Sequence, residues 1–163
     1  RSYFVGCSAG GQQALSQAQR YPADYDGIVA GAPANNRIRQ TFGFLSTWIA
    51  THTPDGKPIL SQAKLSLLTK SAVAACDAND GLKDGLIDDP RRCRFDPATI
   101  ACAAGADEAS CLTAAQVEAA KKVYEGTKNP RTGEVIYTGW PRGSESTDHG
   151  ILLTSDHALI KVP

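Results

Sequence analysis

The sequence predicts a mixed α/β fold in two parts: a strand–turn–helix–strand unit over 1–35 and a loop-rich, disulfide-tied domain over 36–163. An apolar strand from Tyr3 to Val5 runs into a glycine-flanked serine and then into a segment with helical spacing. A second apolar run bounded by glycines, 26–31, is typical of a buried parallel strand. The cysteines cluster in the later part, where strand patterns give way to loops.

The composition excludes several classes of partner. The chain has 163 residues, with 17 Lys plus Arg balanced by 17 Asp plus Glu, and 42% of its residues are hydrophobic. These values are those of an ordinary globular protein without a basic nucleic-acid surface. No apolar stretch reaches the roughly 20 residues of a membrane span. We therefore predict no nucleic-acid or membrane partner, and the sequence leaves the oligomeric state undecided.

The five residues from Gly6 to Gly10 fit the G-x-S-x-G nucleophile elbow of α/β hydrolases. A serine on a sharp strand-to-helix turn leaves little room for side chains two positions to either side, and glycine meets that requirement. The turn would present Ser8 at the positive end of the following helix. A glycine-rich turn with a solvated serine is the alternative, and the flanking strand and helix favour the elbow.

Apolar spacing and capping residues predict four further elements. These are a short buried helix over 42–49, a helix capped by Ser61, a helix with a Thr113–Gln116 capping box, and an extended segment over 134–137.

Five cysteines are many for a reducing compartment, and four of them lie close together, which favours disulfides in an exported protein. Zinc is the alternative, but there is no C-x-x-C pair and the histidines lie elsewhere. A Cys76–Cys93 bond would close an acidic loop, and Cys102 would then pair with Cys111; other pairings stay open. Cys7 is then either free or bonded to a cysteine outside this chain.

The loop over 76–93 alternates aspartates with glycines, as a cradle for a hard cation does. Calcium takes six to eight oxygen ligands and accepts carboxylates together with backbone carbonyls. The predicted Ca²⁺ ligands are the carboxylates of Asp77, Asp80 and Asp84 and the carbonyl oxygens of Leu82 and Leu86. A solvated acidic turn is the alternative; repulsion between close carboxylates favours the cation.

The segments 3–11, 18–22, 26–33 and 76–93 together resemble the tannase and feruloyl esterase family. The resemblance implies a partial α/β-hydrolase core followed by part of a lid domain that carries one structural Ca²⁺. It also implies a secreted, extracellular or periplasmic carboxylic ester hydrolase whose substrates are small aromatic esters of the feruloyl or galloyl type.

The same resemblance assigns roles to residues. Ser8 would be the nucleophile and the backbone N–H of Ala9 one oxyanion donor. Cys7 would be bonded to a cysteine that immediately precedes the catalytic histidine. No histidine here follows a cysteine. We therefore expect that cysteine and the catalytic Asp and His outside these residues, in a longer protein of which this chain is a fragment, inactive alone.

Two other hypotheses remain. A non-catalytic, calcium-stabilised and disulfide-tied binding or structural module would explain 76–111 but not the elbow. Other aromatic esters would retain the chemistry and change the substrate. His149 and His157 each follow an aspartate, but adjacent residues rarely orient one another as a triad requires, so neither is predicted to be the base.

Overall fold

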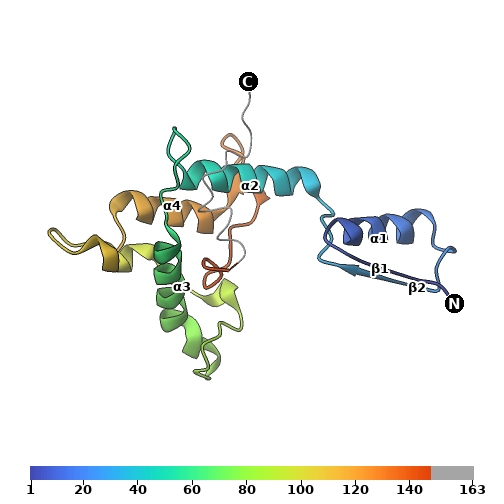
Figure 1. Ribbon diagram of the computed structural model, residues 1–163, viewed down its shortest axis with the longest axis horizontal. Coiled ribbons are helices and arrows are strands. Elements are labelled where there is room, and N and C mark those ends of the chain that lie inside the picture. Colours follow the sequence, from blue (N-terminus) through green and yellow to red (C-terminus); the bar gives the residue numbers. More distant parts are fainter. Residues whose placement is uncertain (148–163) are drawn as a thin grey trace. The chain divides into compact units, whose positions relative to one another are not determined.

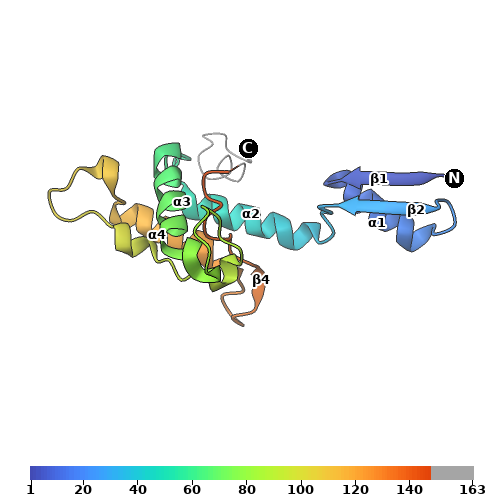
Figure 2. The ribbon, with the colours of Figure 1, turned by 90° about the horizontal axis from the view of Figure 1, so that it is seen from below.

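The computed structural model describes residues 1–147 (Figures 1 and 2). The chain forms two compact units, Arg1–Thr41 and a second that begins at Phe42. The boundary falls within helix α2 (Arg37–Thr51). Among the described residues no helix combines the length and the apolar character that crossing a bilayer demands.

The first unit consists of β1 (Tyr3–Cys7), α1 (Ala9–Arg20) and β2 (Gly27–Gly31). The two strands pair in parallel and in register, from Tyr3 opposite Gly27 to Cys7 opposite Gly31. Helix α1 lies along one face of this pair in both views (Figures 1 and 2). The predicted strand–turn–helix–strand order is confirmed, with β1 two residues longer than expected.

The second unit contains most of α2, two further helices and a two-stranded antiparallel sheet. Helix α3 spans Gln62–Cys76, α4 spans Ala114–Glu125, and β3 (Thr127–Lys128) pairs with β4 (Val135–Tyr137). Single 3₁₀ turns interrupt the connecting loops at Asp77–Asp80, Pro90–Arg92, Pro97–Ile100 and Glu108–Ser110.

The caps predicted for α3 and α4 are confirmed. The Ser61 side chain accepts a hydrogen bond from the Lys64 amide, and Thr113 and Gln116 form a complete capping box. Both helices thereby satisfy amides that lack an intrahelical partner. They bring together the apolar core of this unit, whose most buried members include Leu60, Leu65, Leu68, Leu112 and Val123.

The prediction of a short buried helix over 42–49 is wrong in both length and burial. Helix α2 continues through the polar residues on either side, and Phe42 and Ile49 are 52% and 62% exposed. The opposite face is the packed one: a Cβ on Gly43 would lie 2.3 Å from the tyrosine ring of β4. Close approach at a glycine, rather than burial of the large side chains, therefore decides how this helix packs.

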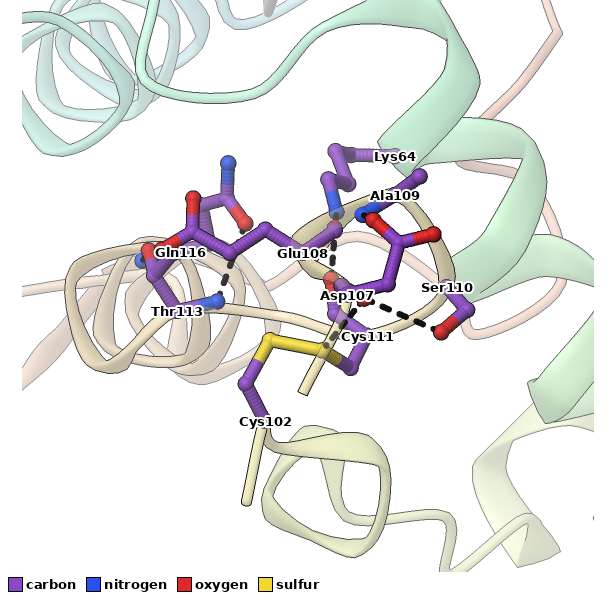
Figure 3. Close-up of a disulfide and its surroundings, with 9 residues drawn as sticks. All are labelled: Lys64, Cys102, Asp107, Glu108, Ala109, Ser110, Cys111, Thr113 and Gln116. Atoms are coloured by element: carbon purple, nitrogen blue, oxygen red, sulfur yellow. Dashed lines mark hydrogen bonds between the residues drawn. A yellow bond between two sulfur atoms is a disulfide. The ribbon is translucent and has the colours of Figure 1, made fainter. Parts of the chain in front are cut away.

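Two disulfides close loops of the second unit, Cys76–Cys93 and Cys102–Cys111. These are the pairings that the sequence favours. Figure 3 shows the second bond and the Lys64 side chain beside it. The Lys64 ammonium is buried and donates hydrogen bonds to the carbonyls of Glu108 and Cys111, so a cation holds the turn that the disulfide closes.

Candidate active site

Ser8 occupies a strained backbone conformation between β1 and α1. Its φ of 58° and ψ of −114° lie where L-residues are rarely found. Among the described non-glycine residues, only Ser8 and Ala32 have positive φ, and Ala32 directly follows β2. Backbone strain persists only where the surroundings enforce it, and it concentrates at functional sites.

Glycines allow this turn to form, but the crowded positions are not both of those that the G-x-S-x-G spacing predicts. A Cβ on Gly6 would lie 2.2 Å from the carbonyl oxygen of Gly10, so no side chain fits at Gly6. Around Gly10 itself the described chain leaves open space, and the expectation of crowding there is wrong. The second crowded position is Gly11, where a Cβ would lie 2.2 Å from the Gly31 carbonyl oxygen. Gly11 therefore sets the approach of α1 to β2.

The backbone of Ser8 is held on both sides by hydrogen bonds, whereas its side chain is exposed. The Ser8 amide donates to the Gly31 carbonyl at 3.1 Å, and the Ser8 carbonyl accepts from the Gln12 amide at 3.1 Å. The side chain is exposed and makes no capping hydrogen bond to α1. The Ser8 hydroxyl is therefore accessible to a substrate and to a base that would activate it.

The amide of Ala9 lies beside this hydroxyl as the first N–H of α1. The first amides of a helix have no intrahelical acceptor, and the helix dipole makes that end positive. An N–H in this position can donate to an oxyanion that forms at Ser8.

His52 is the one histidine within residues 1–147, and its geometry is that of a packing residue. Its ring stacks on Trp48 with centroids 4.6 Å apart, and its Nδ1 lies 2.9 Å from the Trp48 carbonyl oxygen. The side chain is buried within the second unit. His149 and His157 lie outside the described residues.

Cys7, directly before the candidate nucleophile, is exposed and unbonded among the described residues. A Cβ on Gly31 would lie 3.7 Å from the Cys7 sulfur, so the thiol lies at the carboxyl end of both strands. A disulfide formed by this thiol would therefore lie directly beside Ser8.

The predicted calcium loop begins at the C-terminus of α3. Asp77 is 6% exposed, and its Oδ1 accepts hydrogen bonds from the amides of Asp84 and Gly85 at 3.1 and 2.9 Å. The Oδ1 atoms of Asp80 and Asp84 accept from the amides two residues further on, Leu82 and Leu86, at 2.9 and 3.1 Å. Gly81 and Gly85 take positive φ, which lets the chain curl between these carboxylates.

The residue types of this loop suit a hard cation, which binds carboxylate and carbonyl oxygens. For the second oxygen of Asp77, Asp80 and Asp84, no hydrogen bond is found within residues 1–147, so each retains one oxygen for a ligand. Within residues 1–147, no three side chains of Asp, Glu, His or Cys lie close enough together to form a metal centre by themselves. A cation here needs the backbone carbonyls of Leu82 and Leu86 as well, as calcium permits.

Sequence patterns gave no sign of a buried carboxylate at Glu145, in a stretch that reads as polar and irregular. Glu145 is 4% exposed and accepts hydrogen bonds from the Tyr124 hydroxyl at 2.5 Å, the Thr69 hydroxyl at 2.9 Å and the Gly143 amide at 3.0 Å. Burial, followed by the charge of Glu145, raises the pKa of Tyr124 above its ordinary value of 10.0. The two hydroxyl donors, Tyr124 and Thr69, come from distant parts of the sequence, which is why no local pattern indicates them.

A parallel strand pair joined through a strained serine to a crossing helix is the elbow arrangement of α/β hydrolases. The family model for tannase and feruloyl esterase matches residues 1–158, and the chain belongs to that family.

Individual relatives agree with this membership. An uncharacterized esterase of Xanthomonas campestris is 45% identical over 85% of this chain and 24% of its own length. A mono(2-hydroxyethyl) terephthalate hydrolase of Piscinibacter sakaiensis is 38% identical over 86% of the chain and 26% of its own length. The crystal structure of feruloyl esterase B from Aspergillus oryzae superposes with a TM-score of 0.77 at 32% identity, covering 90% of this chain and 30% of that one. The chain thus spans about a quarter of the length of the curated relatives.

Proposed function

We propose that this chain carries the nucleophile of a serine carboxylesterase that acts on small aromatic esters of the feruloyl or galloyl type. The observation that carries the proposal is the strained backbone of Ser8, fixed through its amide and carbonyl while its hydroxyl stays exposed. The names of the relatives support an ester substrate, and the terephthalate hydrolase supports a wider range of aromatic esters.

In the proposed reaction the Ser8 Oγ attacks the ester carbonyl carbon and its proton passes to a histidine base. The carbonyl oxygen becomes an oxyanion that accepts a hydrogen bond from the Ala9 amide. The alcohol leaves with a proton from the base, and water then hydrolyses the acyl-enzyme. The base and its acidic partner are proposed to lie in the length that the relatives have and this chain lacks. This chain alone is then expected to give no turnover.

We further propose a structural Ca²⁺ held by Asp77, Asp80 and Asp84 with the carbonyls of Leu82 and Leu86. Its charge would favour bringing these carboxylates together and would fix the loop that Cys76–Cys93 closes. The two disulfides also support a secreted protein, because such bonds persist in oxidising compartments.

A substitution at Ser8 tests the catalytic proposal in an enzyme of the relatives' full length that contains this segment. Ser8→Ala should lower kcat for an aromatic ester by about 10⁴-fold or more and leave the thermal unfolding midpoint unchanged. Ser16→Ala, an exposed serine of α1, is the matched control and should retain wild-type kcat. Retention of activity in Ser8→Ala would show that another residue is the nucleophile.

The calcium proposal is tested by titrating the metal-free 163-residue chain with Ca²⁺. Binding should raise the unfolding midpoint, because a ligand specific for the folded state stabilises it by mass action. Asp84→Asn should weaken the shift, and Asp107→Asn, in a different loop, should leave it intact. A midpoint that does not move with Ca²⁺ would contradict the site. It would leave the serine mechanism untouched.

A further inference from the structure

The second unit contains a cleft of about 340 Å³ that the proposed ester chemistry does not use. Its charged lining consists of Arg94, Asp96, Lys121, Glu125 and Arg142, and the partly exposed Tyr124 adds an aromatic ring. Cations and an aromatic ring in one hollow suggest a ligand that combines an anionic head with a flat apolar body.

Arg142 is the best-defined cation of this cleft, because two contacts fix its guanidinium. Its Nε donates to the Phe95 carbonyl at 2.8 Å, and its Cζ lies 4.6 Å from the centre of the Tyr124 ring. No hydrogen bond of its two Nη groups is found within residues 1–147. A guanidinium already held in place loses little conformational entropy when it binds a ligand.

The charges of the lining leave an excess of one cation. The Lys121 ammonium lies 3.7 Å from the Asp96 carboxylate, so these two largely cancel. Arg94 and Arg142 then oppose the single carboxylate of Glu125. The planar donor fork of an arginine matches the two oxygens of a carboxylate, and the paired geometry makes such contacts strong.

We propose that this cleft binds a small aromatic carboxylate, with the carboxylate on Arg142 and Arg94 and the ring against Tyr124. The proposal does not depend on Ser8, since every lining residue belongs to the second unit. Glu125 limits the affinity because its charge repels the same head group.

Calorimetric titration of the 163-residue chain with benzoate tests this site, with benzyl alcohol and inorganic phosphate as comparison probes. Benzoate should bind saturably. Benzyl alcohol lacks the charge and phosphate lacks the ring, so each should bind at least about tenfold more weakly. No saturable benzoate binding would overturn the proposal. The proposal would also be overturned if benzyl alcohol or phosphate bound as tightly as benzoate. The site would then not recognise both the carboxylate and the ring.

Substitutions of the charged lining residues locate the binding site, and they should change the affinity for benzoate in opposite directions. Arg142→Gln should weaken benzoate binding about tenfold and Arg94→Gln about threefold, whereas Glu125→Gln should strengthen it about threefold. Arg131→Gln, an exposed arginine of the β3–β4 turn, is the matched control and should bind as the wild type does. Should Arg142→Gln fail to fold by circular dichroism, Arg94→Gln and Glu125→Gln decide alone. If both of these variants bind benzoate with the affinity of the wild type, the proposal is contradicted.

Discussion

The two units of this chain are stabilised in opposite ways. In the first, a strained serine and two glycines allow the backbones of a strand, a turn and a helix to approach closely, and the Ser8 side chain stays exposed. In the second, two disulfides, a buried lysine and a buried glutamate fix loops that contain little regular structure. The first unit therefore depends on the absence of side chains, and the second on specific bonds that its side chains make.

This difference indicates where each kind of substitution should act. An added methyl group should disrupt the elbow and leave the second unit alone, whereas removal of a bond should do the reverse. Because one unfolding curve averages both units, hydrogen exchange of assigned amides is the suitable readout.

The largest effect is expected at Gly6. Gly6→Ala places a methyl group 2.2 Å from the Gly10 carbonyl oxygen, so the turn must open, at a cost of about 4 kcal/mol in the stability of the first unit. Gly10→Ala is the control: its Cβ meets open space on α1, and it should stabilise the unit by up to about 1 kcal/mol. Exchange of β1 and β2 amides reports both. Equal effects of the two substitutions would contradict the assignment of crowding to Gly6.

Removal of the disulfide that closes the longer loop should have the second-largest effect on stability. Replacing Cys76 and Cys93 by serine releases a loop with a sequence separation of 17, and the chain-entropy model predicts a loss of about 3 kcal/mol. The corresponding change at Cys102 and Cys111, with a separation of 9, should cost about 2.5 kcal/mol. Amides of α3 should exchange faster in the first variant, while those of β1 should not change. Loss of β1 protection would mean that the two units are not independent.

Substitution of Glu145 should have the third-largest effect on stability. Glu145→Gln replaces a buried carboxylate that accepts from Tyr124, Thr69 and Gly143 by an amide that cannot satisfy all three donors. We expect a loss of about 2 kcal/mol in the second unit. Glu118→Gln, on the exposed side of α4, should change stability by less than about 0.5 kcal/mol. A Glu145 variant as stable as the Glu118 variant would show that the buried bonds contribute nothing net.

The smallest effect is confined to alkaline pH. The pKa of Tyr124 is raised in the folded state, so above pH 10.0 the unfolded chain loses this proton while the folded chain keeps it. The stabilisation is fully present below the ordinary tyrosine pKa and is lost as pH rises, by at most about 1.4 kcal/mol per pH unit. Tyr124→Phe should remove this slope. Urea unfolding of both proteins from pH 9 to 11 measures it, and identical slopes would contradict the assignment.

Local patterns predicted the local features of both units. The G-x-S-x-G spacing predicted the turn at Ser8, the Thr113–Gln116 spacing predicted a capping box, and both are present in the structure. Each depends on residues within a few positions of one another, which is the range over which sequence patterns carry information.

Features that depend on distant residues were missed or misplaced. The contact of Gly11 with Gly31 joins two elements, and nothing around Gly11 indicates its partner. The apolar side chains of α2 predicted burial, but packing at Gly43 turned the opposite face inward. The Glu145 network joins three segments far apart in the sequence, so a polar stretch gave no sign of a buried anion.

The proposed role of Ser8 is tested most directly by mass spectrometry of a trapped acyl-enzyme. An enzyme of the relatives' full length that carries this segment would be mixed with an aromatic ester, quenched within one turnover and digested. We expect the acyl mass on the peptide that contains Ser8, and we expect it to disappear in Ser8→Ala. Acylation of any other residue, or turnover without an acyl-enzyme in the wild type, would contradict the proposed role.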